Sequence, residues 1–454
     1  MTKKNSTVGI LGAGISGLST AYALSQKNIN VTVYEKEAVV GGAIKTASIN
    51  DWLVEEGPNT LMIKSPELWE LLDSLGLNDI IVEANNIAKK RYVVKNNRPI
   101  PLPLSVSDFL KTSLLSLNAK FRLLKEPFVA KQEQSDESIA SFISRRLGSE
   151  PLDYAINPFV SGIYAGDPKK LSVKHTFAPL WEMEQEHGSL LKGAIKRDRK
   201  NSSIKRSLIS FKEGNQTLPK AMAGAISGTI DIETEITSIT NKDSHWEVGG
   251  NTKGMPFTQT HDVIISTLPA HSLSSIFNIS IPDELNELPY APISVIALGF
   301  RSSQIEHPLD GFGMLIPEVE DRRTLGVLFS STLFPNRVPK DHELLTCFIG
   351  GARNPGLASK PKQELQSIIM DEIGELLNIS GDPIFTHHRY WKKNIPQYEV
   401  GYDQYLKQIE EIEKKHNGLF LDGNFRGGVS VPDCILSGFK TAKKTETFLE
   451  SLSS

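Results

Sequence analysis

The glycine-rich stretch Gly12-Ala13-Gly14-Ile15-Ser16-Gly17 constrains the fold of this chain more than any other feature. An apolar run over residues 7–11 precedes it, a helical pattern over 16–27 follows it, and a β-branched run over 30–34 comes next. In such a turn the first glycine permits the tight bend, the second lets backbone approach a pyrophosphate, and the third allows the helix to pack closely. The helix N-terminus then stabilises phosphate charge. The spacing predicts a βαβ unit that binds a dinucleotide.

Further residues bear on which dinucleotide binds. Glu35 closes the second predicted strand, where a carboxylate can accept hydrogen bonds from the ribose of NAD or of FAD. Gly41-Gly42 and Glu56-Gly57-Pro58-Asn59 supply two more turns that would suit a long dinucleotide, although each could be a plain surface turn. Near the C-terminus, Asp422-Gly423-Asn424 lies between a strand-like run over 418–421 and a helical pattern. A helix that follows such a turn can direct its dipole at a flavin, so ligand loops at both chain ends favour FAD.

Composition excludes several other classes of protein. The chain has 454 residues and a formal net charge of −3, so no basic excess predicts nucleic-acid binding. Cys347 and Cys434 stand far apart, which predicts neither a disulfide framework nor a metal pair. His387 and His388 are adjacent in a predicted strand and should point to opposite faces, so no metal site is predicted. Because the first strand is expected near Val8 and no apolar run reaches about 18 residues, we expect a cytoplasmic protein without signal peptide or membrane-spanning helix.

The middle of the chain changes character twice. Residues 102–129 and 138–159 show helical patterning, with a break expected at Pro151, and residues 291–351 show strand-like apolar runs. The basic stretch 192–206 is interpreted as a flexible loop, with a lipid-headgroup patch as the alternative. We predict a discontinuous dinucleotide domain, a helical insertion and a sheet-based substrate domain. The dinucleotide domain is expected over residues 1–90, 206–280 and 411–454. The helical insertion is expected over 91–205 and the substrate domain over 281–410.

The sequence also resembles a known family over most of its length. It resembles the flavin-containing amine oxidase superfamily in the segments VGILGAGISGLSTAYAL, VTVYEKEAVVGGAIKT and VEEGPNTL. It is similar to the oxygen-dependent protoporphyrinogen oxidases in KKRYVVKNNRPIPLP, NPFVSGIYAGDPKKLSVKHTFAPLWEMEQEHGSLL, TLGVLFSSTLFPNRVP, YWKKNIPQY and LFLDGNFRGGVSVPDCILSG. The resemblance implies an α/β fold, with a Rossmann-like FAD-binding domain of the amine oxidase and p-hydroxybenzoate hydroxylase type. A sheet-based substrate domain and a helical, membrane-associating insertion complete it.

The resemblance also implies which residues hold the cofactor. Cys434 follows Pro432-Asp433 and does not match the motif of covalently flavinylated amine oxidases, so noncovalent FAD is expected. The expected cofactor residues are Gly12, Ala13, Gly14, Ser16, Gly17, Glu35, Lys36, Gly42, Ala43, Gly57, Pro58, Asn59, Ile236, Trp391, Gly423, Asn424, Val429 and Val431.

A porphyrinogen site is implied as well, as an apolar slot beside the flavin with a cation for the propionates. Arg91 matches the propionate-binding arginine, although a strand-end surface charge is the alternative. Three apolar residues that match the slot walls could equally be core; they are Met314, Leu328 and Phe348. Small or polar cavity residues are matched by Gly162, Ala165 and Asn59, with a turn cap as the alternative for Asn59. No residue is assigned as acid or base.

The implied reaction is the FAD-dependent oxidation of protoporphyrinogen IX to protoporphyrin IX by O2, giving H2O2, late in heme biosynthesis. The nearest alternative is the same chemistry on coproporphyrinogen III, and more distant ones are a flavin amine oxidase, a carotenoid desaturase or a silent FAD-binding scaffold. Residues 102–129 match the region by which the family rests on membranes, with a buried amphipathic helix pair as the alternative. The expected location is therefore peripheral on the inner face of a membrane. A homodimer and handover of product to ferrochelatase are further expectations.

Overall fold

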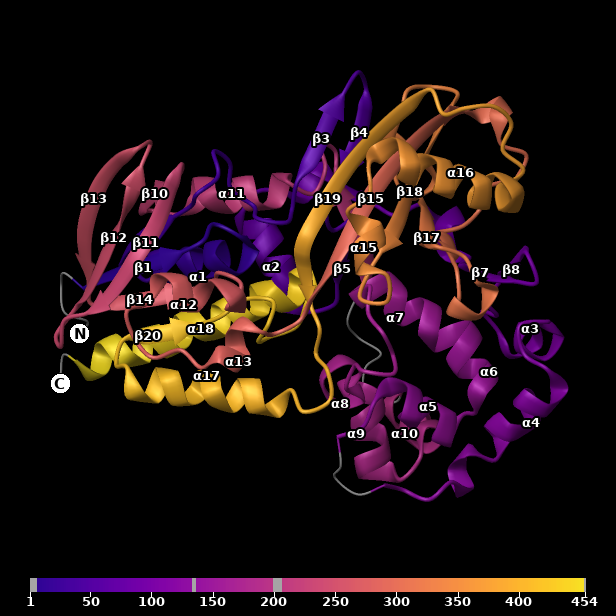
Figure 1. The fold of residues 1–454 in the computed structure, drawn as a ribbon, viewed down its shortest axis with the longest axis horizontal. Helices are drawn as coiled ribbons and strands as arrows, with labels where there is room; N and C mark the ends of the chain where they lie inside the picture. Colours follow the sequence, from indigo (N-terminus) through magenta and orange to yellow (C-terminus); the bar gives the residue numbers. More distant parts are fainter. Residues whose placement is uncertain (1–5, 133–135, 199–205, 453–454) are drawn as a thin grey trace.

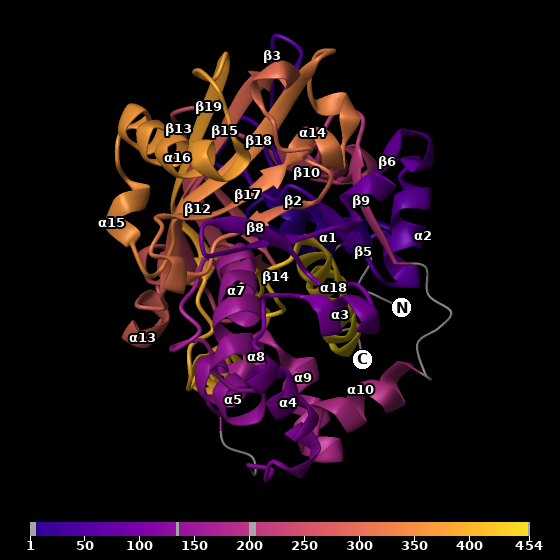
Figure 2. The same cartoon turned by 90° about the vertical axis from the view of Figure 1, so that its right-hand side faces the viewer.

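A computed structural model describes residues 6–132, 136–198 and 206–452. Its parts are arranged as a parallel-sheet unit at the end that carries both termini, a large second sheet beside it, and a group of helices below that sheet (Figure 1). The same arrangement is seen from the side of the helices in Figure 2.

The parallel sheet contains both predicted strands of the glycine motif. Its strand order is β10-β2-β1-β14-β20, and each neighbouring pair is parallel. The strands are β1 (Thr7–Leu11), β2 (Asn30–Tyr34), β10 (Thr229–Asp231), β14 (Val263–Ser266) and β20 (Leu419–Leu421). Because β20 pairs with β14, the two ends of the chain lie in one sheet, as the sequence predicts.

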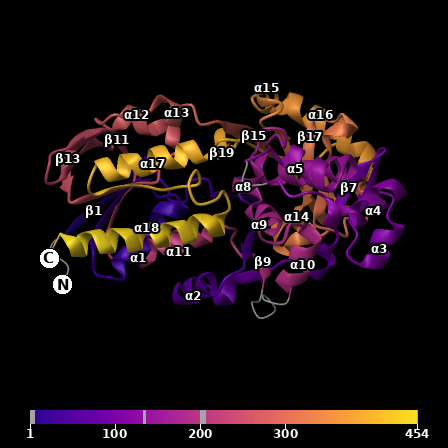
Figure 3. The same cartoon turned by 90° about the horizontal axis from the view of Figure 1, so that it is seen from below.

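Helices cover one face of this sheet and a small antiparallel sheet covers the other. The helices are α1 (Ile15–Ser25), α11 (Thr217–Ala225) and α18 (Val431–Ser451). The opposite face carries β11 (Thr234–Asn241), β12 (Trp246–Thr252), β13 (Met255–His261) and α17 (Asp403–Lys415), and Figure 3 shows α17 and α18 from below. A Cβ added at Gly438 would lie 2.7 Å from the Ser16 carbonyl oxygen, so α18 packs closely on α1. Smaller elements nearby are β3 (Thr46–Ile49), β4 (Trp52–Glu55), β5 (Leu61–Ile63), α2 (Pro66–Ser74), β6 (Ile81–Glu83), β9 (Ser207–Phe211), α12 (Leu273–Ile276) and α13 (Asp283–Asn286).

The second large sheet has seven strands in the order β19-β15-β18-β17-β16-β7-β8. They are β15 (Tyr290–Arg301), β16 (Gly313–Leu315), β17 (Thr324–Phe329), β18 (His342–Gly350), β19 (Phe385–Pro396), β7 (Tyr92–Lys95) and β8 (Arg98–Pro101). Helix α16 (Lys362–Leu377) packs on it, and α14 (Ser330–Leu333) and α15 (Pro355–Ala358) lie in its connections. The β7–β8 hairpin pairs with this sheet, although the sequence interpretation places residues 92–101 in the helical insertion.

The helical insertion differs from the sequence interpretation in two places. Its helices are α3 (Val106–Lys111), α4 (Leu117–Leu124), α5 (Ile139–Arg146), α6 (Ser149–Pro151), a π-helical turn (Leu152–Ile156), α7 (Asn157–Tyr164), α8 (Val173–Thr176), α9 (Ala178–His187) and α10 (Leu190–Asp198). The break occurs at Gly148, with φ +103°, and not at Pro151, because a proline is tolerated in a first helical turn. The stretch 192–206 is not simply a loop, because residues 192–198 belong to α10, while 199–205 lie outside the described residues.

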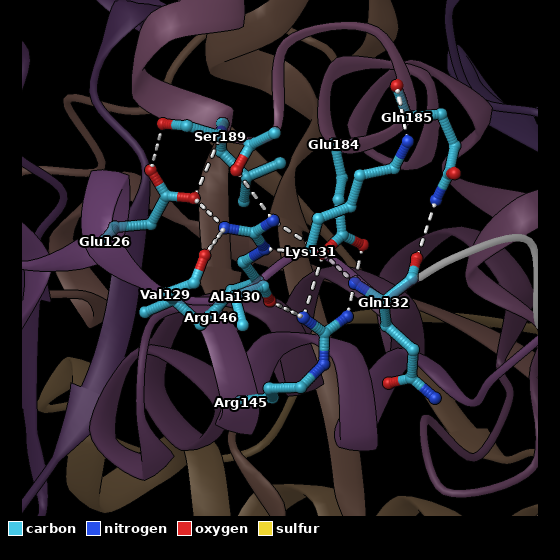
Figure 4. A network of polar contacts seen from close by, with 12 residues as sticks. Glu126, Val129, Ala130, Lys131, Gln132, Arg145, Arg146, Glu184, Gln185 and Ser189 are labelled. Atoms are coloured by element: carbon cyan, nitrogen blue, oxygen red, sulfur yellow. Dashed lines mark hydrogen bonds and ion pairs between the residues drawn. The ribbon is translucent and has the colours of Figure 1, made fainter.

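A buried ion-pair network holds the insertion together (Figure 4). Arg146 is fully buried, with Nη1 2.9 Å from Glu126 Oε1 and Nη2 2.6 Å from Glu184 Oε1. Glu126 also accepts hydrogen bonds from Ser189 Oγ at 2.6 Å and from the N–H of Leu190 at 2.9 Å. The segment that follows α4 is therefore tied to α5, α9 and α10 by charges that are paired on every side.

Candidate functional site

The turn between β1 and α1 has the geometry that the glycine motif predicts. Gly12 has φ +94°, and its N–H donates to the Tyr34 carbonyl at 2.8 Å. A Cβ added at Gly17 would lie 2.0 Å from the Gly12 carbonyl oxygen, so only glycine fits there. A Cβ added at Gly14 would meet no atom within 4 Å. That open space lies at the N-terminus of α1, where the free N–H groups of a helix can bind a pyrophosphate.

Glu35 lies directly beside this turn at the end of β2. It is 7% exposed, and its Oε2 accepts a 2.8 Å hydrogen bond from the N–H of Ala13, while Oε1 accepts one of 2.9 Å from Glu37. A carboxylate offers about four acceptor positions. Glu35 therefore retains capacity for ribose hydroxyls while it fixes the loop at Ala13.

Two further loops stack on the glycine turn. A Cβ at Gly42, which has φ +58°, would lie 3.1 Å from the Cα of Gly14. A Cβ at Gly57 would in turn lie 2.0 Å from the carbonyl oxygen of Ala43. The loops 12–17, 41–43 and 57–59 therefore lie side by side, and glycine is needed where they touch.

Asn59 ends the third loop and lines a small internal cavity. Its Nδ2 donates to the Gly57 carbonyl at 2.9 Å, so Asn59 does cap its own turn. The adjoining Pro58 carbonyl accepts a 2.8 Å hydrogen bond from Asn215 Nδ2. The conformation of this loop is thus fixed by residues distant in sequence.

The C-terminal turn joins the same sheet edge. Asp422 is fully buried, and its carboxylate accepts hydrogen bonds from Ser437 at 2.6 Å and from Thr441 at 3.0 Å, both on α18. Burial raises the pKa of Asp422, and these hydrogen bonds oppose that rise. Gly423 has φ +130°. Asp422 therefore fixes the turn to α18, and the Asn424 side chain is held in turn by a 3.3 Å hydrogen bond from its Nδ2 to the Asn394 carbonyl.

The other predicted cofactor residues have varied surroundings. Ser16 is buried in the first turn of α1, Val431 begins α18, Val429 precedes its N-cap Ser430, Lys36 is exposed after β2, and Ile236 is half-buried in β11. The open space at Gly14, the carboxylate at the end of β2, the stacked loops and the C-terminal turn together fit an extended dinucleotide such as FAD.

Trp391 is held against the third loop by a residue that the sequence interpretation passed over. The indole Nε1 donates to the carbonyl of Glu56 at 2.7 Å, and the Glu56 carboxylate lies 2.7 Å from His387 Nε2. The hydrogen bond from His387 lowers the pKa of Glu56. His388 instead contacts Ser294 Oγ at 2.8 Å, so the two histidines do point apart. Glu56 stands within the VEEGPNTL segment, but its partners lie on β19, far along the chain.

Leu328 and Phe348 lie on one face of the seven-stranded sheet. Phe348 pairs with Gly326, and Leu328 pairs with Thr346, so the two apolar side chains are diagonal neighbours across β17 and β18. Both are only half-buried. This face of the sheet therefore presents two apolar side chains that are partly exposed.

Met314 lies on the opposite face, so the structure does not bring it beside Leu328 and Phe348, the other two expected slot walls. It pairs with Val327, is 1% exposed, and packs in the core with Cys347 and Ile349. Because side chains alternate along a strand, Val327 and Leu328 face opposite ways. This burial supports the core alternative for Met314, and its place as a slot wall stays a prediction.

The two predicted small residues of the cavity differ in burial, since Ala165 is buried and Gly162 is exposed. Ala165 is 3% exposed, adopts φ +46° after α7, and packs in one cluster with Phe348 and Trp391. The structure thus brings together one slot wall and the aromatic residue expected at the flavin. Gly162 is exposed, and a Cβ there would lie 3.0 Å from Leu315 Cδ2.

Arg91 stands directly before β7 and is exposed. Its guanidinium lies 5.1 Å from the ring centroid of Phe312, and Phe312 and Leu328 both pack against a second apolar cluster, that of Ala88, Leu333 and Phe334. Among the described residues no carboxylate pairs with Arg91, whereas the adjacent Lys90 is paired with Asp310. The predicted cation is therefore available beside the Leu328 end of the apolar face.

Comparison with known proteins defines the family. The model of the flavin containing amine oxidoreductases matches residues 15–444. The chain belongs to this family. Protoporphyrinogen oxidase 2 of Arabidopsis thaliana is 36% identical to it, covering 98% of this chain and 95% of that protein. Coproporphyrinogen III oxidase of Bacillus subtilis (strain 168) is 28% identical, covering 97% and 98%.

The comparison also confirms the predicted fold and cofactor. A crystal structure of a protein from Exiguobacterium sp. 255-15 superposes with a TM-score of 0.82 at 22% sequence identity, covering 97% of this chain and 99% of that one. The fold is that of the FAD-dependent amine oxidoreductases. The protein is accordingly an FAD-dependent oxidoreductase.

Proposed function

We propose that this oxidoreductase converts protoporphyrinogen IX to protoporphyrin IX, with O2 as the final acceptor and H2O2 as the product, in a late step of heme biosynthesis. The observation that carries the proposal is the 36% identity to a protoporphyrinogen oxidase across 98% of the chain. When bound, FAD accepts the electrons that leave the macrocycle. The protein supplies the binding surfaces and their charges.

The geometry supports a binding role for each group of predicted site residues. The open space at Gly14 and the acceptor Glu35 would hold the cofactor's pyrophosphate and ribose. Leu328 and Phe348 contact the apolar ring system and exclude water from it. Arg91 binds a propionate carboxylate, for which a guanidinium offers two parallel hydrogen bonds.

The thiol nearest the C-terminal turn supports noncovalent FAD. Cys434 is 5% exposed, and burial raises its pKa to about 12. The thiol is therefore protonated at neutral pH and is a poor nucleophile toward a flavin.

Coproporphyrinogen III is the second candidate substrate, because the Bacillus subtilis relative covers the chain as fully at 28% identity. That substrate carries propionates where the first carries vinyl groups, so its site needs more cationic charge. Lys90, the cation next to Arg91, is already paired with Asp310. This pairing favours protoporphyrinogen IX. Porphyrin fluorescence measured with the two porphyrinogens side by side tests the choice, and faster turnover of coproporphyrinogen III would overturn it.

We also propose that the protein rests on a membrane surface through residues 102–129. Leu114 and Ala119 of this segment are buried, but seven of its other apolar side chains are exposed, and we call these seven the apolar rim. They are Leu104, Val106, Leu110, Leu117, Phe121, Leu124 and Phe128, with exposures of 63, 78, 65, 70, 64, 67 and 89%. Lys111 and Lys125 are exposed among these apolar side chains, as in helices that bind lipid headgroups. In the three described stretches of chain, no helix is long and apolar enough to cross a bilayer.

The inner face of a membrane as location, the homodimer and the handover of product to ferrochelatase stay predictions. The division into segments 1–90, 91–205, 206–280, 281–410 and 411–454 is likewise our proposal, except that residues 92–101 pair with the seven-stranded sheet and are assigned to it.

A further inference from the structure

A small cavity lies where the flavin-side loop meets the seven-stranded sheet. Its walls come from Leu53, Glu55 and Asn59 on one side and from Ser330, Leu333, Phe334, Arg337, Leu344 and Thr346 on the other. The space in which the centre of a water molecule can lie has a volume of about 10 Å³. A volume of roughly this size holds one water, provided that polar partners surround it.

A buried ion pair forms the polar wall of this cavity. Arg337 is 2% exposed and Glu55 is 4% exposed, and Nη2 lies 2.8 Å from Oε1. Glu55 also accepts hydrogen bonds from Thr46 Oγ1 at 2.7 Å and from the N–H of Asn215 at 2.9 Å. Such a pair is retained at little cost only if its remaining hydrogen-bonding groups are satisfied.

The pair is connected to the loop that carries Asn59. Arg337 donates to the hydroxyl of Ser210, and Ser210 Oγ donates to Asn215 Oδ1 at 2.7 Å. Asn215 Nδ2 then donates to the Pro58 carbonyl at 2.8 Å. Ser210 and Asn215 are both fully buried. An arginine from the connection before β18 is thereby linked, through two side chains, to backbone beneath the predicted flavin position.

One hydrogen-bond donor of this network, on Arg337, has no acceptor among the described residues. Arg337 Nη1 is buried, and no described residue accepts a hydrogen bond from it. An unpaired donor inside a protein costs free energy that a bound water recovers. Two hydroxyl groups that could complete the water's coordination, those of Ser330 and Thr346, line the same cavity and lie 2.7 Å apart.

We infer that the cavity binds one internal water that accepts a hydrogen bond from Arg337 Nη1, and that the network so completed makes Arg337 a positioning residue for the loop 57–59. The inference rests on the proposed placement of that loop beside FAD. Arg337 is not among the residues expected to contact cofactor or substrate; it acts through Glu55 and Asn215 on the loop backbone. Loss of Arg337 should therefore weaken FAD binding without removing any group that contacts FAD.

The test is a titration of apoprotein with FAD, followed by flavin fluorescence, on the full-length chain. We expect Arg337→Met to raise the Kd for FAD by about tenfold, and Arg337→Lys to recover part of that loss. Arg146→Met is the matched control, because Arg146 is an equally buried, doubly paired arginine in the helical insertion. It should lower the thermal unfolding midpoint but leave the Kd for FAD within about twofold of wild type.

A second variant keeps the inference testable if Arg337→Met does not fold. Asn215→Ala preserves the ion pair and removes the contact with Pro58, so it too should weaken FAD binding. An unchanged Kd in Asn215→Ala, or in folded Arg337→Met, overturns the positioning role. A high-resolution crystal structure that shows an empty cavity overturns the water.

The proposed cofactor placement fails separately, if Gly14→Val binds FAD as wild type does.

Discussion

Gly42 packs backbone to backbone against Gly14, since a Cβ at Gly42 would come within 3.1 Å of the Gly14 Cα. The Cβ direction of Gly14 itself is open, with no atom within 4 Å. One side of Gly14 is thus closed by protein, and the other remains free for a ligand.

Gly14→Val should abolish FAD retention, because the side chain would fill the space where the pyrophosphate approaches. Gly224→Val is the matched control, because Gly224 on α11 also has no atom within 4 Å of an added Cβ. Absorbance of the purified proteins in the visible range gives the flavin content. A yellow Gly14→Val protein with wild-type flavin content would contradict the placement.

Arg91→Ala should raise KM for protoporphyrinogen IX by about tenfold and leave the bound FAD unchanged, since a charge-assisted hydrogen bond to the propionate is lost. Steady-state kinetics with the FAD-loaded enzyme measures the effect. Lys89→Ala, the removal of another exposed cation in the same chain segment, should leave KM unaltered. Equal KM values for wild type and Arg91→Ala would remove Arg91 from the site.

Charge placed in the apolar rim should release the protein from lipid. The double variant Phe121→Glu/Phe128→Glu is expected to cosediment less with liposomes of mixed neutral and anionic lipids, while keeping activity on dissolved substrate. Met255→Glu is the control, because Met255 is a comparably exposed apolar residue, at 68%, on β13 at the opposite end of the molecule. Unaltered binding of the double variant would refute this surface.

His261 should make stability depend on pH. Its Nε2 lies 2.7 Å from the hydroxyl of Tyr34, its Nδ1 has no partner among the described residues, and burial lowers its pKa to about 4. The unfolded chain has the ordinary pKa near 6.5 and therefore binds a proton before the folded chain does. The neutral, buried His261 therefore contributes its full stabilisation above about pH 6.5. As the pH falls toward about 4, the free energy of unfolding decreases by up to roughly 3 kcal/mol.

Urea unfolding of wild type and His261→Gln between those pH values measures this contribution. The free energy of unfolding should fall more steeply in wild type than in the variant. Parallel pH profiles would show that His261 does not titrate as its burial implies.

Local spacing was enough to predict the fold around the glycine turn. The glycine turn, Glu35 and the strands around them are set by residues within one βαβ unit, and the structure places them as expected. The extra loops at Gly42 and Gly57 were also recognisable, because each carries glycine where backbone meets backbone.

The substrate half depended on strand register, which spacing does not contain. Met314 and Leu328 both stand in apolar runs, and only the pairing of β16 with β17 shows that they face opposite sides of the sheet. The burial of Arg337 could not be predicted from the sequence either, because it depends on a residue distant along the chain. Its partner Glu55 lies on a strand of the flavin side, so in the sequence Arg337 cannot be distinguished from a surface arginine.

The most direct test mixes FAD-loaded protein with protoporphyrinogen IX in the absence of oxygen and follows flavin absorbance and porphyrin fluorescence together. We predict that the flavin absorbance bleaches, and that on admission of O2 it returns with formation of H2O2 and protoporphyrin IX. Flavin that stays oxidised in the presence of protoporphyrinogen IX would contradict the account.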